Sequence, residues 1–418
     1  MFDEIIAPAI ADTEGSRLRL REAAPAAVAI RSFSIDKRDG AFDPATARID
    51  AEFGMINANF DAVLGESVAA RTTRSIDLGK IQGAITRAAS ESEEPIRFTL
   101  ESLDEANEPR FTVEGELNTA AAPGTNRLSA SASGDIPTAL IDVLAGQRGL
   151  LVAGVGDTVR VSAQADDVTA DRTQGKLTAT VQALRAEAAA FGRFENGALV
   201  LGDGTASRTN ITLSEITPEL SRRVFEPLFP LLRNFEKSRT DQPTMITVTS
   251  AGLSIPTDGD LTKLSGNINL NLGTVRFEAG DLLSTALSAT ANRTAGQLGQ
   301  SVPPVLVRFN AGVATYDTVD IPFGDFTLRT RGTIDLVNQR MDVLVLLPLD
   351  FIGGDFKRAA QQFPLLNQLA AVPLRAKGEL GKANFEIDPS AIQEIIPGAL
   401  EQNLNDLLNR GLQELFRR

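Results

Sequence analysis

The sequence predicts a mainly β protein: an elongated antiparallel sheet that forms a twisted open groove from two related halves, with short helices and a C-terminal amphipathic helix. Three observations predict this fold class. Apolar and polar residues alternate along much of the chain, aromatic residues make up only 5%, and one pattern recurs after about half the length. A chain of 418 residues also exceeds one ordinary core, which favours two domains or an architecture that grows by repetition.

The alternation is clearest where three asparagines interleave with Ile268, Leu270 and Leu272. This period of two is typical of a strand with one wet and one apolar face. Shorter segments with the same pattern are separated by Gly, Asn, Asp and Pro, and they lie at 28–30, 96–100, 111–113, 159–161 and 177–181. We therefore expect antiparallel strands along most of the chain.

The period of a helix appears in short segments only. Helices are predicted at 135–144, from Thr217 with Pro218 at the first helical position, at 281–287 and at 356–370. From Pro389 the apolar residues keep a three-and-four spacing, and its apolar face includes Leu404, Leu408, Leu412 and Phe416. This terminal helix would pack on the sheet, plug the end of the groove, or lie in a membrane interface. Its acidic polar face weighs against the membrane, because interfacial helices are usually basic.

An internal repeat relates the two parts of the chain at a long spacing. The strand after Pro25 matches the strand after Pro243, an offset of 243 − 25 = 218. Matching segments are 28–30 with 246–248, 49–54 with 268–273, and Phe60 with Phe277. The predicted halves are therefore residues 1–215 and 216–418.

The apolar strand positions carry mostly Ala, Leu, Ile and Val. A two-layer sandwich and an open groove both need one apolar face per strand, so alternation alone does not separate them. The shortage of large aromatics favours a smooth groove suited to acyl chains. The predicted lining residues are Val28, Ile30, Phe53, Ile246, Val248, Ile268, Leu270, Leu272, Val343 and Val345.

Composition excludes several classes of function. Cys and His are absent, which removes the nucleophiles, bases and zinc ligands of those types. The formal charge of −13 would repel nucleic acid. No apolar run is long enough to span a bilayer, and Asp3 and Glu4 stand where a signal peptide would be basic. We expect no cofactor and no metal.

Three polar motifs have alternative interpretations. Residues 154–156 hold two glycines of a nucleotide loop, but the third glycine is missing and a glycine turn is favoured. Acid pairs at 166–167 and at Asp335 with Asp342 suggest glycoside hydrolysis, although no aromatic platform for sugar accompanies them. Three aspartates after Tyr316 offer oxygen ligands for calcium without the spacing of an EF-hand, and they are Asp317, Asp320 and Asp325.

A hairpin at 333–347 turns at Asn338 and Gln339 and is apolar on both faces. Either the predicted helix at 356–370 covers one face, or that face touches lipid. The hairpin belongs to an ordered set of motifs, which are 266–273, 312–316, 332–343, 372–380 and 385–389.

Together these motifs resemble the carboxy-terminal region of AsmA-like envelope proteins, well over the last third of the chain and more loosely elsewhere. The resemblance implies a periplasm-facing β-groove of the bridge-like lipid-transfer type, anchored at one membrane by an amino-terminal helix. It implies a role in moving phospholipid or maintaining the outer membrane, and it supplies no catalytic residues. No such anchor is recognisable in this sequence.

The sequence thus predicts a non-enzymatic lipid-binding or lipid-transfer module of the bacterial cell envelope, located in the periplasm. Its expected ligand is phospholipid or another acyl lipid, and its terminal helix is the expected contact for a membrane or an envelope protein. The alternative is a structural β-sandwich scaffold or assembly protein of the envelope without a lipid channel. An acid-pair hydrolase is the third hypothesis.

Overall fold

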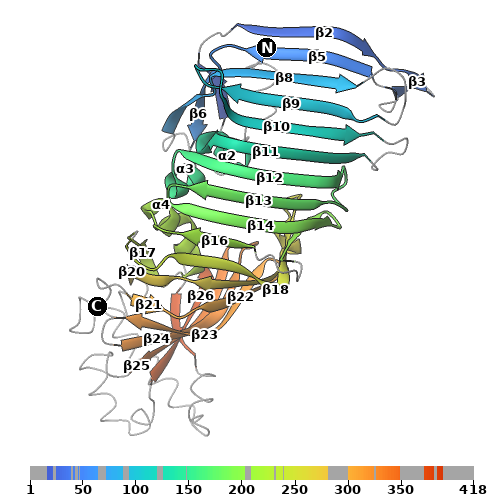
Figure 1. Ribbon diagram of the computed structural model, residues 1–418. Helices are drawn as coiled ribbons and strands as arrows, with labels where there is room; N and C mark the ends of the chain where they lie inside the picture. The colour runs from blue at the N-terminus through green and yellow to red at the C-terminus, as the bar shows by residue number, and fades with distance from the viewer. Residues whose placement is uncertain are drawn as a thin grey trace, which may run out of the picture. The chain divides into compact units, whose positions relative to one another are not determined.

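The computed structural model describes residues 17–21, 25–38, 41–42, 46, 48–64, 72–87, 94–119, 126–146, 148–202, 209–229, 232–238, 240–280, 300–323, 326–348, 371–380 and 384–388. They form mainly antiparallel strands with a few short helices, which confirms the mainly β, antiparallel part of the predicted fold class (Figure 1). The chain divides into two compact units. Unit 1 comprises Met1–Ile211 with Ser254–Gly259, and unit 2 comprises Thr212–Leu253 with Asp260–Arg418.

Unit 1 is built on one large sheet. Its strands are β2 (Ala26–Ser34), β5 (Arg48–Met55), β8 (Lys80–Arg87), β9 (Ile96–Leu103), β10 (Pro109–Asn118), β11 (Arg127–Pro137), β12 (Thr158–Thr169), β13 (Lys176–Ala183), β14 (Ala186–Glu195) and β15 (Ala198–Leu201). Each strand pairs antiparallel with the next one in this order. From β8 to β15, each ladder of this series joins strands that are neighbours in the sequence.

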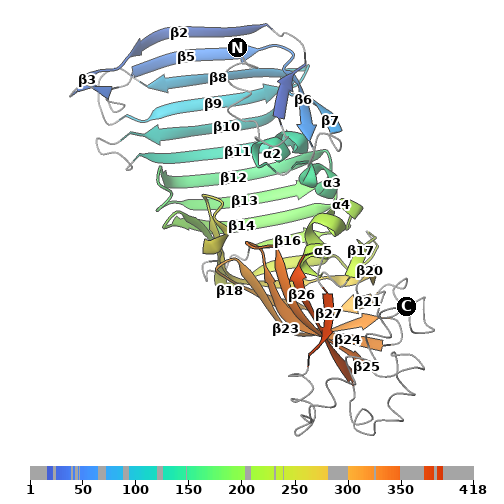
Figure 2. The same ribbon diagram turned by 180° about the vertical axis from the view of Figure 1, so that it is seen from behind.

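A small sheet and two helices gather at one end of these long strands (Figures 1 and 2). The small sheet has the order β1 (Arg17–Leu20), β6 (Asn59–Leu64) and β7 (Thr72–Asp77). The helices, α2 (Thr138–Leu144) and α3 (Leu150–Val155), lie in the connection from β11 to β12. The core of unit 1 forms here, with Phe60, Leu64, Ile76, Val143 and Val152 among its buried residues. A two-residue pair, β3 (Lys37–Arg38) and β4 (Ala41–Phe42), completes the unit.

The helix predicted at 135–144 begins later than expected. Residues 135–137 continue strand β11, and α2 starts at Thr138. The cause is a cross-strand pair, because Asp135 lies opposite Arg160 and accepts a hydrogen bond of 2.8 Å from its Nε. Asp135 therefore serves the sheet and does not cap the helix.

Unit 2 contains a second antiparallel sheet. Its consecutive partners are β19 (Ser265–Asn271), β22 (Val305–Asn310), β23 (Val313–Phe323), β24 (Phe326–Asp335), β25 (Arg340–Pro348), β26 (Ala371–Glu379) and β27 (Asn384–Ile387). A small sheet has the order β17 (Leu232–Glu236), β20 (Gly273–Ala279) and β21 (Gln300–Val302). Strands β16 (Asn210–Leu213) and β18 (Thr244–Pro256) each have residues in both units, and a 3-10 turn, η5 (Leu261–Lys263), belongs to unit 2.

The two units repeat one order of strand pairing. In unit 1, β6 pairs with both β1 and β7, while β5, β8 and β9 pair in succession. In unit 2, β20 pairs with both β17 and β21, while β19, β22 and β23 pair in succession.

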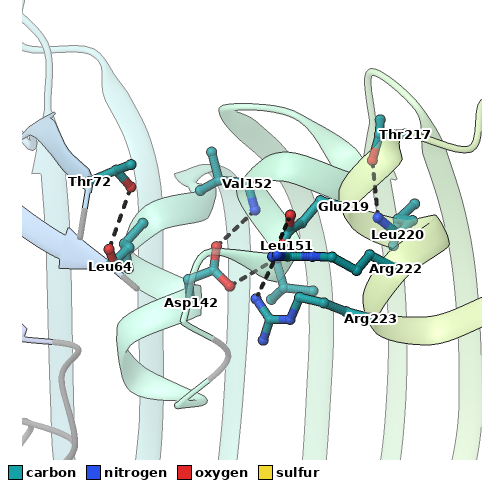
Figure 3. Close-up of polar contacts among 10 residues, drawn as sticks. All are labelled: Leu64, Thr72, Asp142, Leu151, Val152, Thr217, Glu219, Leu220, Arg222 and Arg223. Carbon is teal, nitrogen blue, oxygen red and sulfur yellow. Dashed lines mark hydrogen bonds and ion pairs between the residues drawn. The ribbon is translucent and has the colours of Figure 1, made fainter. Parts of the chain in front are cut away.

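The helix predicted from Thr217 is confirmed. It comprises α4 (Pro218–Leu220), a π-helical turn η4 (Ser221–Phe225) and α5 (Glu226–Leu228). The Thr217 hydroxyl accepts a hydrogen bond from the Leu220 N–H, and Glu219 pairs with Arg222 and Arg223 (Figure 3). Pro218 occupies the first turn, where its missing N–H costs nothing.

Four phenylalanines fix this helix on the small sheet of unit 2. The Phe235 ring centroid lies 5.8 Å from that of Phe225, 5.9 Å from that of Phe229 and 5.8 Å from that of Phe277. The tilted rings are in the favourable range for aromatic pairs.

The hairpin predicted at 333–347 is also confirmed. Strands β24 and β25 are joined by a turn at residues 336–339, where the Asp335 carboxylate accepts from the Val337 and Asn338 N–H groups. The helices predicted at 281–287, at 356–370 and from 389 onward lie outside the described residues. Among the helices that the structure does describe, none has both the length and the apolar character needed to cross a membrane.

Candidate functional site

The strand register of unit 1 assembles two adjacent rows of apolar side chains across its large sheet. The first row contains Val28, Phe53, Gly83, Leu100, Val113, Ala132, Ala163, Ala179 and Ala190. The second row contains Ile30, Ala51, Ile85, Phe98, Gly115, Ala130, Ala165, Leu177 and Gly192. Both rows lie on the same face, and we call them together the apolar surface. It crosses β2, β5 and β8 to β14 without a polar residue.

The opposite face of the same sheet is largely polar. Cross-strand hydrogen bonds join Gln82 to Glu101 at 2.8 Å and Ser131 to Glu114 at 3.2 Å. The hydrogen bond from Arg160 holds the pKa of Asp135 below its usual value. This difference between faces follows from the period of two, because successive side chains on a strand point to opposite faces.

Phenylalanine rings lie over glycines within the apolar surface. A Cβ at Gly83 would stand 2.4 Å from Cζ of Phe53, and a Cβ at Gly115 would stand 2.7 Å from Cζ of Phe98. Each ring thus occupies the space that a neighbouring side chain would fill. Only glycine fits at these two positions without displacing a ring.

The exposure of the apolar surface differs between the edge strand and the interior. Val28 and Ile30 of β2 are 70% and 65% exposed. Along β13 the residues alternate between exposed polar and half-buried apolar side chains, Leu177 and Ala179 among the latter. Leu100 and Val113 of the first row pack against the core described above, whereas the row members on β11 to β14 are half-buried and remain partly accessible.

One charged side chain lies on this face beyond the two rows. Arg87 is opposite Ile49 in the register and only 6% exposed, and its Nη1 donates to the Thr119 hydroxyl at 3.0 Å. Ser102, also buried, donates to the Leu78 carbonyl oxygen at 2.7 Å. Both polar groups therefore have partners, as buried groups generally require.

The apolar face of the unit 2 sheet is buried instead. Leu270 is 2% exposed, and Val343 and Val345 are fully buried. An apolar cavity of about 20 Å³ remains on this face, lined by Phe229, Ile268, Leu270, Val305, Val307, Phe309, Ala314, Tyr316 and Ile334. That volume is about that of one water-sized sphere and far too small for an acyl chain. Burial raises the pKa of Tyr316 to about 12.

The structure therefore separates the residues predicted to line the groove. Val28, Ile30 and Phe53 lie on the apolar surface of unit 1, where the edge residues are exposed. The other predicted lining residues belong to unit 2: Val248 and Leu272 are buried like Leu270, Val343 and Val345, while Ile246 and Ile268 are half-buried. The buried ones offer no surface to a ligand, because their side chains are already packed. The four residues of the predicted terminal helix, Leu404, Leu408, Leu412 and Phe416, lie outside the described residues.

Of the apolar surface, only Val28, Ile30 and Phe53 were predicted to line a groove. The members that were not predicted include small residues such as Ala132, Ala163 and Ala190. The usable signal was the alternation of Ala with Ser or Thr, as in Leu128–Gly134, but its contrast in hydropathy is low.

The acidic motifs that the structure describes make local hydrogen bonds or ion pairs, and Asp325 lies outside the described residues. Asp317 pairs with Arg308 and Asp320 with Arg329, each at 2.8 Å, and these contacts lower the pKa of both carboxyl groups. Across β25 and β26, Asp342 pairs with Arg375 at 2.6 Å. Within the described ranges, no group of three or more acidic residues is placed to hold a metal ion.

The glycine motif at 154–156 forms the end of helix α3. Gly156 has φ of +119° and follows the last helical residue, Val155. The start of the helix is fixed by Asp142, which is fully buried and accepts hydrogen bonds from the Leu151 N–H at 3.0 Å and the Val152 N–H at 2.8 Å (Figure 3). The motif is thus the C-terminal end of α3, and the N–H groups at the other end of the helix already bind the Asp142 carboxylate.

Comparison of the chain with protein-family models, with curated proteins and with solved structures finds no match.

Proposed function

We propose that this protein is a non-enzymatic lipid-binding or lipid-transfer module of the bacterial cell envelope, and that acyl chains lie along the apolar surface of unit 1. One observation carries the proposal: two adjacent rows of apolar side chains cross the sheet from β2 to β14 without a polar interruption. The resemblance of the C-terminal motifs to AsmA-like envelope proteins agrees with it and suggests a periplasmic location.

The dimensions of the apolar surface suit acyl chains. Nine strands, β2, β5 and β8 to β14, define eight spacings of about 4.8 Å, or a path of about 38 Å. The hydrocarbon core of a bilayer is about 30 Å thick and holds two chains end to end. The path is therefore longer than one acyl chain, so that a chain could occupy successive positions along it.

The energetic contribution would come from burial of hydrocarbon. Each methylene removed from water contributes about 0.8 kcal/mol, without any need for a particular headgroup. The small residues on β11 to β14 leave room for a chain, and the rings over Gly83 and Gly115 keep the path even. Low selectivity among headgroups is the expected consequence.

A scaffold function is the second candidate, and the buried face of unit 2 favours it. Val343 and Val345 have no exposed surface, as in the core of a structural domain. We further propose that the two units are related halves, because their strands share one pairing order. In that arrangement one half would bind lipid and the other would be a packed structural counterpart.

The test begins with purification of the protein without detergent, followed by solvent extraction and mass spectrometry of bound lipid. We expect phospholipid or fatty acid at one or more molecules per chain. The decisive variant is Ala179→Asp, which places a charge in the first row of the apolar surface. It should reduce bound lipid at least tenfold, because an acyl chain would have to contact an ionised carboxylate.

The matched control is Thr178→Asp, one residue earlier on the same strand and exposed on the opposite face. It adds the same charge and should retain lipid at the original level. Thermal unfolding of both variants shows whether they fold. Folded wild-type protein that carries no lipid and binds no fluorescent fatty acid would refute lipid binding and favour the scaffold.

A further inference from the structure

The outer edge of β2 is an unusual feature of unit 1. All nine residues of this strand are exposed, and β5 is its only strand partner within the described part of the chain. Natural edge strands commonly prevent association with proline, charged side chains or bulges; β2 has no proline or lysine and carries one charged residue, Arg31, at a bulge. Its apolar side chains Val28, Ile30 and Phe33 are 70%, 65% and 61% exposed.

We propose that β2 pairs antiparallel with β2 of a second copy of this chain, so that two unit 1 sheets join edge to edge around a two-fold axis beside Ala29. Two-fold dimers are the commonest symmetric assemblies, and the same surface must then be complementary to itself. An exposed strand edge supplies the main-chain donors and acceptors for such a ladder.

The side chains of β2 select this register. With Ala29 opposite its own copy, Val28 lies opposite Ile30, so the two most exposed apolar side chains of the strand meet on the same face. Moving the centre by one residue, to Val28 or to Ile30, would place Ile30 opposite Ala26 or Val28 opposite Ser32, and the contact between the two apolar side chains would be lost. The antiparallel register centred on Ala29 avoids this loss.

Charge also favours the antiparallel arrangement. Arg31 lies at a bulge between Ile30 and Ser32 and pairs with Glu52 of its own sheet at 2.8 Å. In the proposed ladder it faces Ala27 of the other copy. A parallel, in-register ladder would instead place the two copies of Arg31 opposite each other, which is unfavourable.

Such a dimer would join the apolar surfaces of two copies into one. The rows would continue through Val28 and Ile30 across the axis. This inference goes beyond the proposed function and does not depend on it, because strand pairing needs no lipid.

Disulfide formation tests the register directly, since the chain has no cysteine of its own. In Ala29→Cys the two new cysteines face each other with Cα atoms about 5 Å apart, within the range for a disulfide. In the control Ser34→Cys, ten residues of ladder separate the two cysteines, about 33 Å at roughly 3.3 Å per residue. Mild oxidation should therefore cross-link most of the Ala29→Cys protein and little of the control.

Light scattering of the unmodified protein supplies the second readout. We expect a dimer that Ala29→Lys converts to monomer, because two lysines would face each other, and that Ser34→Lys leaves intact. Both positions are exposed, so neither change should prevent folding. A monomer at the highest attainable concentration, or equal cross-linking of the two cysteine variants, would overturn the proposal. The lipid content of monomeric Ala29→Lys separates the two proposals. Retained lipid would show that lipid binding does not depend on the dimer.

Discussion

Tyr316 provides a direct test of how tightly the apolar face of unit 2 is packed. It is the single tyrosine of the chain, which also lacks tryptophan, so its ionisation can be followed by ultraviolet absorbance without overlap. Burial raises its pKa from 10.0 to about 12, and a hydrogen-bonding contact of 3.3 Å with Thr330 offsets this effect in part. Tyrosinate should therefore be absent from the folded protein at pH 10.

The same shift makes stability depend on pH. The unfolded chain releases the tyrosine proton near pH 10, whereas the folded chain retains it to about pH 12. Above pH 10 the unfolded state therefore binds fewer protons, and the free energy of unfolding decreases as pH rises. A pKa difference of two corresponds to about 3 kcal/mol in full, of which about 2 kcal/mol is lost between pH 10 and pH 12, because the loss begins below pH 10 and ends above pH 12.

The assay is urea unfolding at a series of alkaline pH values, for the wild type and for Tyr316→Phe. The variant has no phenol to ionise. The lysines titrate in the same pH range in both proteins, so the difference between the two free energies of unfolding reports on Tyr316 alone. Between pH 10 and pH 12 the free energy of unfolding of the wild type should fall by about 2 kcal/mol relative to that of Tyr316→Phe. Tyrosinate that appears near pH 10 in protein still folded by circular dichroism would refute the described packing around Tyr316.

Three further predictions concern stability, each measured by urea unfolding. Gly134→Ala should cost at least about 2 kcal/mol more than Gly197→Ala, because a Cβ at Gly134 would stand 2.2 Å from the Arg110 carbonyl oxygen, whereas nothing lies within 4 Å at Gly197; equal costs would contradict the close approach. Asp142→Ala should cost about 2–3 kcal/mol because two N–H groups of α3 lose their acceptor, and Asp142→Asn, which keeps one oxygen, should cost less; a neutral Ala variant would show that the cap is dispensable. Lys237 donates to two backbone carbonyls, and burial lowers its pKa from 10.5, so the unfolded state binds more protons and stability should rise with pH toward 10.5; Lys237→Met should lose this rise and about 1–3 kcal/mol, and an unchanged slope would count against the burial effect.

The faces of the strands could be predicted from the sequence where hydropathy contrast is high. The alternation at 341–347 gave the buried side of β25, and Thr217 with Pro218 gave the start of a helix. Alternation cannot distinguish a covered face from an accessible one, because both need apolar residues. This is why Val28 and Val343 looked alike in the sequence but differ in exposure from 70% to none.

The apolar surface itself could not be predicted, because it depends on register. A row forms only when each of eight ladders is aligned, and bulges such as that between Leu128 and Ala130 change the alignment by one residue. Asp135 illustrates the same limit: its partner Arg160 is distant in sequence, so a helix cap and a strand position could not be separated.

From β8 to β14, each strand pairs with the next strand in the sequence, and this arrangement affects how such a protein can change its length in evolution. Each strand contacts chiefly the strand before it and the strand after it, so stability accumulates locally along the sheet, much as it does in repeat proteins. Because strand direction alternates in an antiparallel sheet, adding or removing a two-strand hairpin keeps the direction of all later strands. Adding or removing a single strand would reverse the direction of all later strands. Length should therefore vary by two strands at a time, about 10 Å per step, with the chemistry of each face unchanged.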